Sequence, residues 1–173
     1  LSGGVWYGRS SNHQYDEWQY NFALSQEMDG YSFYVGYTHL FFAKDDESDD
    51  EWSAGISYEG LPFELITALD ATYSMDAKGI FYEWSNTKEF NLREDLNLSF
   101  SGTLGWNEGY VADGHNGLNF FSLRSGVEKI LSDNFSLAGH GVNSWAIDPD
   151  KNLAGDQSLK DFFHFGVGVE YKF

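Results

Sequence analysis

The chain has 173 residues and a formal net charge of −17, with 27 acidic residues against 10 Lys and Arg. This balance argues against nucleic acid as a partner, because DNA and RNA binding needs a basic surface. No apolar run approaches the length of about 18 residues that a transmembrane helix needs, and the mean hydropathy is −0.44. The length favours a single domain covering residues 1–173.

The composition is rich in aromatic residues and glycine. Aromatics make up 18% of the chain, glycine occurs 19 times, proline occurs twice and cysteine is absent. A low mean hydropathy is compatible with a transmembrane β-barrel, because only every second residue of its strands faces lipid. The start, Leu-Ser-Gly-Gly, carries no basic and apolar signal segment and suits a mature form after signal-peptide removal.

Ten stretches alternate between apolar and polar residues with a period of two. This period places alternate side chains on opposite faces of a strand, whereas no window keeps a helical period. The first stretch has a weak pattern, and the seventh has the clearest one. The predicted strands cover roughly residues 3–10, 17–27, 31–42, 52–58, 63–73, 80–89, 96–107, 121–131, 135–145 and 163–173.

The connections between these stretches alternate in length. Short turns at residues 28–30, 60–62, 91–95 and 132–134 follow the even-numbered stretches. The connections at 44–51, 108–117 and 148–161 are long, and those at 11–16 and 75–79 are intermediate. Outer-membrane barrels have short periplasmic turns and longer outer loops. The alternation therefore predicts an even number of strands with all short turns on one side.

The last stretch has Phe163, Phe165, Val167, Val169, Tyr171 and Phe173 on one face and small or polar residues on the other. It resembles the closing strand of bacterial outer-membrane β-barrels, whose C-terminal aromatic belongs to the signal that the barrel-assembly machinery reads. The resemblance implies an all-β, closed antiparallel up-and-down transmembrane barrel of ten strands, with eight as the second choice. It also implies a Gram-negative outer-membrane location in contact with lipid and lipopolysaccharide.

Alternation alone does not say which face is inside, and a soluble sandwich or lipocalin-like barrel stays open as the alternative. Aromatic residues near both ends of the apolar faces suit the two interfacial girdles of a membrane barrel. The polar faces would then line a lumen. Their ionisable residues would either pair and stiffen a filled interior or line a narrow path that favours cations. The lumen-lining candidates are Glu64, Asp70, Glu83, Glu89, Arg124, Glu128, His140, His164 and Glu170.

Two acidic segments are candidate Ca²⁺ sites, and no other cofactor is expected. Residues 45–51 hold six acids in seven positions, and we expect a solvated loop there. Asp148, Asp150, Asn152 and Asp156 stand at positions 1, 3, 5 and 9 of a calcium-loop pattern. The pattern is incomplete, because it lacks the glycine at position 6 and has Leu159 in place of the bidentate Glu.

The favoured function is a structural or interaction role in the cell envelope, with acidic outer loops and an unknown partner protein. The alternative is a small cation-favouring channel or porin. A rim-type hydrolase, as in omptin proteases or lipid-A deacylases, is less favoured, because no catalytic set is evident. His140 is followed by Asn143 and Ser144, which departs from the deacylase His-x-Ser pattern, while His39 and His115 stand near acids such as Asp113.

Overall fold

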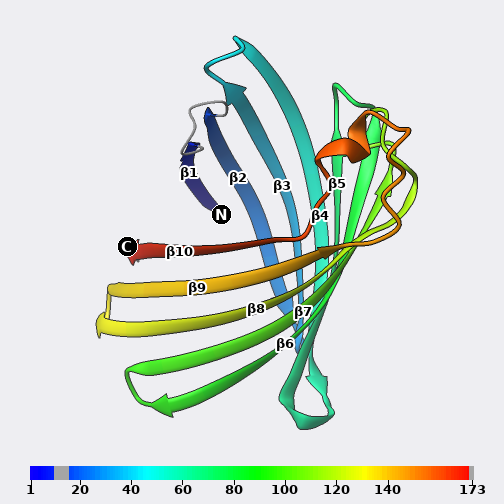
Figure 1. Cartoon of the computed structure of the whole chain (residues 1–173). Helices are drawn as coiled ribbons and strands as arrows, with labels where there is room; N and C mark the ends of the chain where they lie inside the picture. The colour runs from blue at the N-terminus through cyan, green and yellow to red at the C-terminus, as the bar shows by residue number, and fades with distance from the viewer. Residues whose placement is uncertain (10–15, 172–173) are drawn as a thin grey trace.

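The computed structural model describes residues 1–9 and 16–171, which form one antiparallel sheet of ten strands in chain order. The sheet is strongly curled and twisted into an open half-barrel (Figure 1). The strands are β1 (Ser2–Arg9), β2 (Asp16–Met28), β3 (Tyr31–Phe42), β4 (Glu47–Leu61), β5 (Leu65–Ser74), β6 (Gly79–Arg93), β7 (Leu96–Glu108), β8 (Gly117–Ser132), β9 (Phe135–Ala146) and β10 (Phe162–Tyr171).

Two single 3₁₀ turns, η1 (Pro62–Glu64) and η2 (Gly155–Ser158), complete the described elements. Neither comes near the length or apolar character that a membrane-crossing helix would need.

The all-β prediction and the count of ten strands are confirmed. Each strand pairs with its neighbour in sequence, from β1 with β2 to β9 with β10. Within the described residues, β1 and β10 are not paired with each other, so the sheet keeps two free edges. The structure therefore establishes a curled antiparallel sheet, and closure into a barrel is a separate question.

The alternation of connection lengths is also present. Tight turns at residues 29–30, 62–64, 94–95 and 133–134 lie at one end of the strands. Asp29 and Gly30 both have positive φ, 52° and 81°, which is the geometry of a two-residue hairpin turn whose twist matches the flanking strands. The longer connections, residues 43–46, 75–78, 109–116 and 147–161, lie at the other end.

The prediction of an acidic loop over residues 44–51 is wrong, because β4 begins at Glu47 and pairs with β3 from there. Alternation sends Asp49 and Glu51 to one face and Asp50 to the other, which separates the charges. Each carboxylate also accepts a hydrogen bond, Asp49 from Ser74 Oγ (2.6 Å) and Asp50 from Tyr37 Oη (2.6 Å). These contacts let an acidic run extend a strand.

Phe63 was predicted to begin the fifth strand, and this is also wrong. Phe63 and Glu64 lie in η1 with φ of 65° and 54°, a left-handed backbone that no strand residue adopts. Proline at position 62 cannot donate a ladder hydrogen bond, so the turn follows it and β5 begins at Leu65.

Cross-strand pairing keeps one face of the sheet largely apolar along all ten strands. A representative row joins Leu24, Val35, Ala54 and Ala71 across β2 to β5. These apolar side chains are exposed, as Leu24 at 65% and Val167 at 75% illustrate. Leu40 and Val142 are the only hydrophobic residues that are buried in the described part of the chain. The chain therefore has an apolar outer surface and almost no conventional hydrophobic core.

The opposite, polar face is the concave one. The Tyr34 hydroxyl on β3 donates to Asp70 on β5 over a distance of 2.7 Å, across the intervening β4. Tyr110, in the β7–β8 connection, reaches Glu51 on β4. The inward curl of the sheet brings these polar groups together on its concave side.

Gly55 creates the space for the bond between Tyr34 and Asp70. It is paired with both residues, and a Cβ atom at this position would collide with Asp70 Oδ1 and with the Tyr34 ring. We predict that Gly55→Ala lowers the free energy of unfolding by about 1–3 kcal/mol, because the bond must break for the methyl group to fit.

Denaturant unfolding measures this loss. Gly4→Ala is the matched control, because a Cβ at Gly4 meets no atom within 4 Å. Gly55→Ala should cost less in a Tyr34→Phe background, where the hydrogen bond is already absent. An equal cost in both backgrounds would contradict the assignment.

Candidate functional site

The polar concave face carries seven of the nine lumen-lining candidates. Asp70 and Glu83 are direct cross-strand partners on β5 and β6. Cross-strand pairing also places the other five candidates on this face, on β6 and on β8 to β10. These five are Glu89, Arg124, Glu128, His140 and His164.

The remaining two candidates are placed differently. Glu64 lies in η1, and its carboxylate accepts a 2.6 Å hydrogen bond from Lys88 Nζ. Lys88 belongs to the apolar face, where it pairs with Phe100 and lies 5.4 Å from the ring centroid of Phe90. Glu170 pairs with Ser136 through the backbone of β10, and its side chain lies outside the described part.

A wide acidic cavity opens at the end of the sheet that carries the longer connections. Its volume is about 1200 Å³. Ser74 Oγ and the Asp76 backbone N–H hold Asp49 in position at 2.6 and 3.1 Å. The described lining includes no basic side chain, so the mouth has a negative potential. Its acids are Glu17, Glu47, Asp49, Glu51 and Asp76.

One buried ion pair ties the two longest connections together at this end. His115 Nδ1 lies 2.6 Å from Asp156 Oδ2, and His115 Nε2 lies 2.8 Å from the Leu118 carbonyl oxygen. Both ring nitrogens therefore face acceptors, which suits the doubly protonated imidazolium. The hydrogen bond to the Leu118 carbonyl and the Asp156 carboxylate raise the pKa of His115.

Asp156 is almost fully buried, at 3% exposure. Burial alone would raise its pKa, but the backbone N–H groups of Asp150 and His115 and the His115 side chain outweigh it and lower the pKa. These donors lie at 2.8, 3.1 and 2.6 Å from the carboxylate oxygens. Both shifts favour the charged form of the pair, and its hydrogen bonds join residues 147–161 to residues 109–116.

The proposed calcium ligands take part in this same network. Asp156 accepts three N–H bonds, and Asp150 Oδ1 accepts two from Asn152. No group of three or more His, Cys, Asp or Glu residues is placed to hold a metal ion in residues 1–9 and 16–171. Ca²⁺ binding by Asp148, Asp150, Asn152 and Asp156 stays a prediction, and no step below depends on it.

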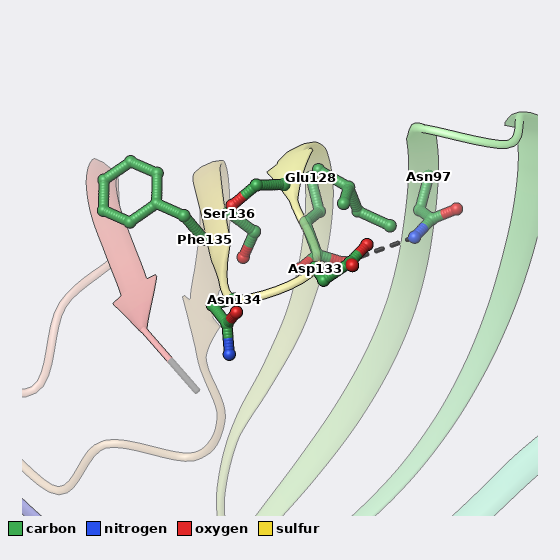
Figure 2. A pocket seen from close by; sticks show the side chains of 8 residues that line it. Asn97, Glu128, Asp133, Asn134, Phe135 and Ser136 are labelled. Atoms are coloured by element: carbon green, nitrogen blue, oxygen red, sulfur yellow. Dashed lines mark hydrogen bonds between the residues drawn. The ribbon is translucent and has the colours of Figure 1, made fainter. Parts of the chain in front are cut away.

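A smaller pocket of about 240 Å³ lies at the tight-turn end of β7, β8 and β9. Figure 2 shows Asn97, whose amide donates to Glu128 at 3.2 Å, and the β8–β9 turn with Asp133 and Asn134. Ser136 is 7% exposed, and its hydroxyl has no hydrogen-bond partner within the described chain. The pocket is small and open at this rim.

Two histidine–acid pairs test the hydrolase alternative. His39 Nδ1 lies 2.8 Å from Asp50 Oδ1 on the apolar face, and His115 pairs with Asp156 in the connections. Neither imidazole is bonded to a serine or threonine hydroxyl among the described residues. The chain matches no protein-family model and no curated protein. No catalytic arrangement is evident in the described residues, and the concave face and its mouth form the candidate site.

The ion pair predicts a pH window for the order of residues 147–161. A raised His115 pKa gives a stabilisation that is complete below its unfolded value of about 6.5 and is lost as pH rises through the folded pKa. A lowered Asp156 pKa gives a second stabilisation. It is complete above the unfolded-state pKa of about 3.9 and is lost as pH falls through the folded pKa. Protection should therefore be greatest between about pH 4 and pH 6.5.

Proteolysis or hydrogen exchange of residues 147–161 across pH measures this window. Asp156→Asn should speed opening roughly tenfold or more within it, because charge-assisted hydrogen bonds are lost, and should flatten the pH profile. Asp29→Asn, at the opposite end of the sheet, is the control. A native profile that does not change between pH 4 and 9 would contradict the role of the pair.

Proposed function

We propose that this protein is an integral β-barrel of the bacterial outer membrane, in which β1 and β10 close against each other. It has a structural role in the cell envelope or binds a partner there. The acidic mouth, the end of the sheet where the 1200 Å³ cavity opens, faces outward. The observation that carries this proposal is the exposed and largely apolar convex face, which polar residues such as Asn86, Lys88 and Asn143 interrupt at single positions. Hydrocarbon is the surrounding that makes such a face favourable, since each Å² of apolar surface removed from water contributes about 25 cal/mol.

The distribution of residue types along the convex face supports a membrane setting. The rings of Tyr7 and Trp18 are in tilted contact near the mouth, with centroids 4.6 Å apart. Tyr31 and Tyr58 stack at 4.5 Å beside the tight turns. Aliphatic residues such as Leu24 and Val35 lie between these ends. Aromatic girdles around an aliphatic band are the pattern of barrels that cross a bilayer.

The two free edges support closure. In hydrocarbon, each unpaired backbone N–H or C=O costs several kcal/mol, and closing the sheet removes both edges. β1 and β10 provide 8 and 10 residues for the missing ladder. On this proposal, the partners are outer-membrane lipid, lipopolysaccharide and the barrel-assembly machinery, which would engage β10.

Disulfide trapping tests closure directly, because the native chain has no cysteine. A Cβ atom added at Gly4 on β1 or at Gly168 on β10 would meet no atom within 4 Å, so each position accepts a cysteine. In membranes, Gly4→Cys should form a disulfide with His164→Cys or with Gly168→Cys. On a denaturing gel, an unheated folded barrel migrates faster than a heated, unfolded one. The cross-linked chain should need a higher temperature before this faster migration disappears.

The positive control is Gly4→Cys with Asn21→Cys, which are cross-strand partners of β1 and β2. This pair should cross-link whether or not the sheet closes. Cross-linking of the control alone, together with extraction of the protein by salt without detergent, would overturn the proposal.

The second candidate function is a small cation-favouring channel, and the acidic cavity at the mouth favours it. A mouth lined by acids and free of described basic residues concentrates cations. In planar bilayers the protein would then show conductance steps whose reversal potential in a salt gradient indicates cation preference. Glu47→Gln with Asp76→Asn should shift the reversal potential toward zero.

Asp29→Asn with Glu94→Gln, in turns at the opposite end of the sheet, also removes two acids and should leave the reversal potential nearly unchanged. Absence of conductance in the native protein would exclude the channel and leave the structural role.

A further inference from the structure

A cavity of about 400 Å³ lies on the concave face, separate from the acidic mouth. Strands β6 to β10 form its wall, and Leu159 and Lys160 at the end of the β9–β10 connection also line it. This volume lies in the range of small-molecule sites. The ion pair of Asp156 with His115 lies just before Leu159, so the covering segment is held in place.

Small polar side chains line part of the wall. Asn119, Ser122 and Ser144 line the cavity and are 7%, 9% and 3% exposed. An amide both donates and accepts hydrogen bonds, and so does a hydroxyl. The three side chains therefore offer hydrogen-bonding groups to whatever fills the cavity.

The described lining of this cavity holds more basic than acidic side chains, in a chain of net charge −17. Arg124 and Lys160 line it, and neither makes an ion pair within residues 1–9 and 16–171. Glu83 is its only acid in the described lining, so one positive charge remains in excess. Arg124 is exposed on the concave face, and the planar fork of an arginine is suited to bidentate recognition of a carboxylate.

Apolar side chains provide the rest of the lining. Phe120 lies over Gly105, where a Cβ atom would collide with its ring. Phe162 stacks with His164 at 5.8 Å between ring centroids and an interplanar angle of 19°. Together with Val142 and Leu159, these rings provide a surface for an apolar body.

We propose that this cavity binds a small monoanionic organic molecule, an aromatic or similarly apolar carboxylate. Its apolar part lies against Phe120, Val142, Leu159 and Phe162. Its carboxylate meets Arg124 and Lys160, and the buried amide and hydroxyl groups complete the hydrogen bonding. Every lining residue comes from β6 to β10 or the β9–β10 connection, so the proposal does not depend on β1 closing against β10.

Calorimetric titration of the full chain in detergent, with phenylacetate as the probe, tests the proposal. Phenethylammonium has the same apolar body with the opposite charge, and we expect it not to bind. Arg124→Gln should weaken phenylacetate binding about tenfold or more, the factor expected for losing a hydrogen bond to a charged group. Arg93→Gln, at the tight-turn end of β6, is the matched control and should bind as the native protein does.

Lys160→Gln in the connection is a second variant that leaves every strand unchanged, with Lys151→Gln as its control. It should also weaken binding. Absence of phenylacetate binding to the native protein, equal binding of the ammonium probe, or equal affinities of the variants and their controls would each overturn the proposal. The disulfide test of closure is unaffected by any of these results.

Discussion

The rest of this structure depends on one constraint: side chains alternate between the two faces of each strand, and the strand register keeps these faces aligned. Each strand places alternate residues on opposite faces, and the ten-strand ladder keeps the faces aligned from β1 to β10. The concave row through Tyr34, Gly55, Asp70 and Glu83 shows the alignment on the polar side. A slip of one residue in any hairpin would move charges to the apolar side, so the tight turns fix the fold as firmly as the strands do.

The contacts on the concave face depend on pairing small residues with large ones. Glycine at positions 55, 105 and 166 leaves room for Tyr34, Phe120 and His140 to extend across a neighbouring strand. Tyr34 thereby reaches Asp70 across β4, and Phe120 on β8 stacks with Phe81 on β6, so these side chains join strands that the ladder does not pair. The longer connections continue this arrangement, since Asp156 fixes the covering segment and Tyr110 reaches β4. A polar wall, an acidic mouth and a cavity whose described lining has an excess of basic side chains thus coexist on one face.

The strands could be predicted from sequence because alternation is local. The turn at Asp29 and Gly30 could likewise be predicted, because two adjacent residues determine it. The acids of β4 could not be placed, because the groups that stabilise Asp49 and Glu51, Ser74 and Tyr110, lie 25 and 59 positions further along the chain. For the same reason the sequence put Asp156 in a calcium pattern and gave no sign that it pairs with a histidine 41 residues away.

For the candidate site, the sequence could predict only which residues share a face of the sheet. The register places Asp70, Glu83, Arg124 and His164 on the polar face, and their role in lining a lumen stays a prediction. Alternation could not say that Glu83 and Arg124 share a cavity, or that Asn119, Ser144 and Lys160 complete it, because curvature brings five strands together there. Glu64 was misjudged for a local reason, since the turn after Pro62 interrupts the alternation and directs it to Lys88.

The central claim is that the convex apolar face lies in hydrocarbon and the concave face does not. Single cysteines in this cysteine-free chain can carry spin labels at Leu69, Leu104 and Val127 on the convex face and at Ala68 and Thr103 on the concave face. In membranes, the account predicts that collision with oxygen dominates at the first three positions and collision with a water-soluble nickel complex at the other two. Absence of this alternation, or its reversal, would contradict the account.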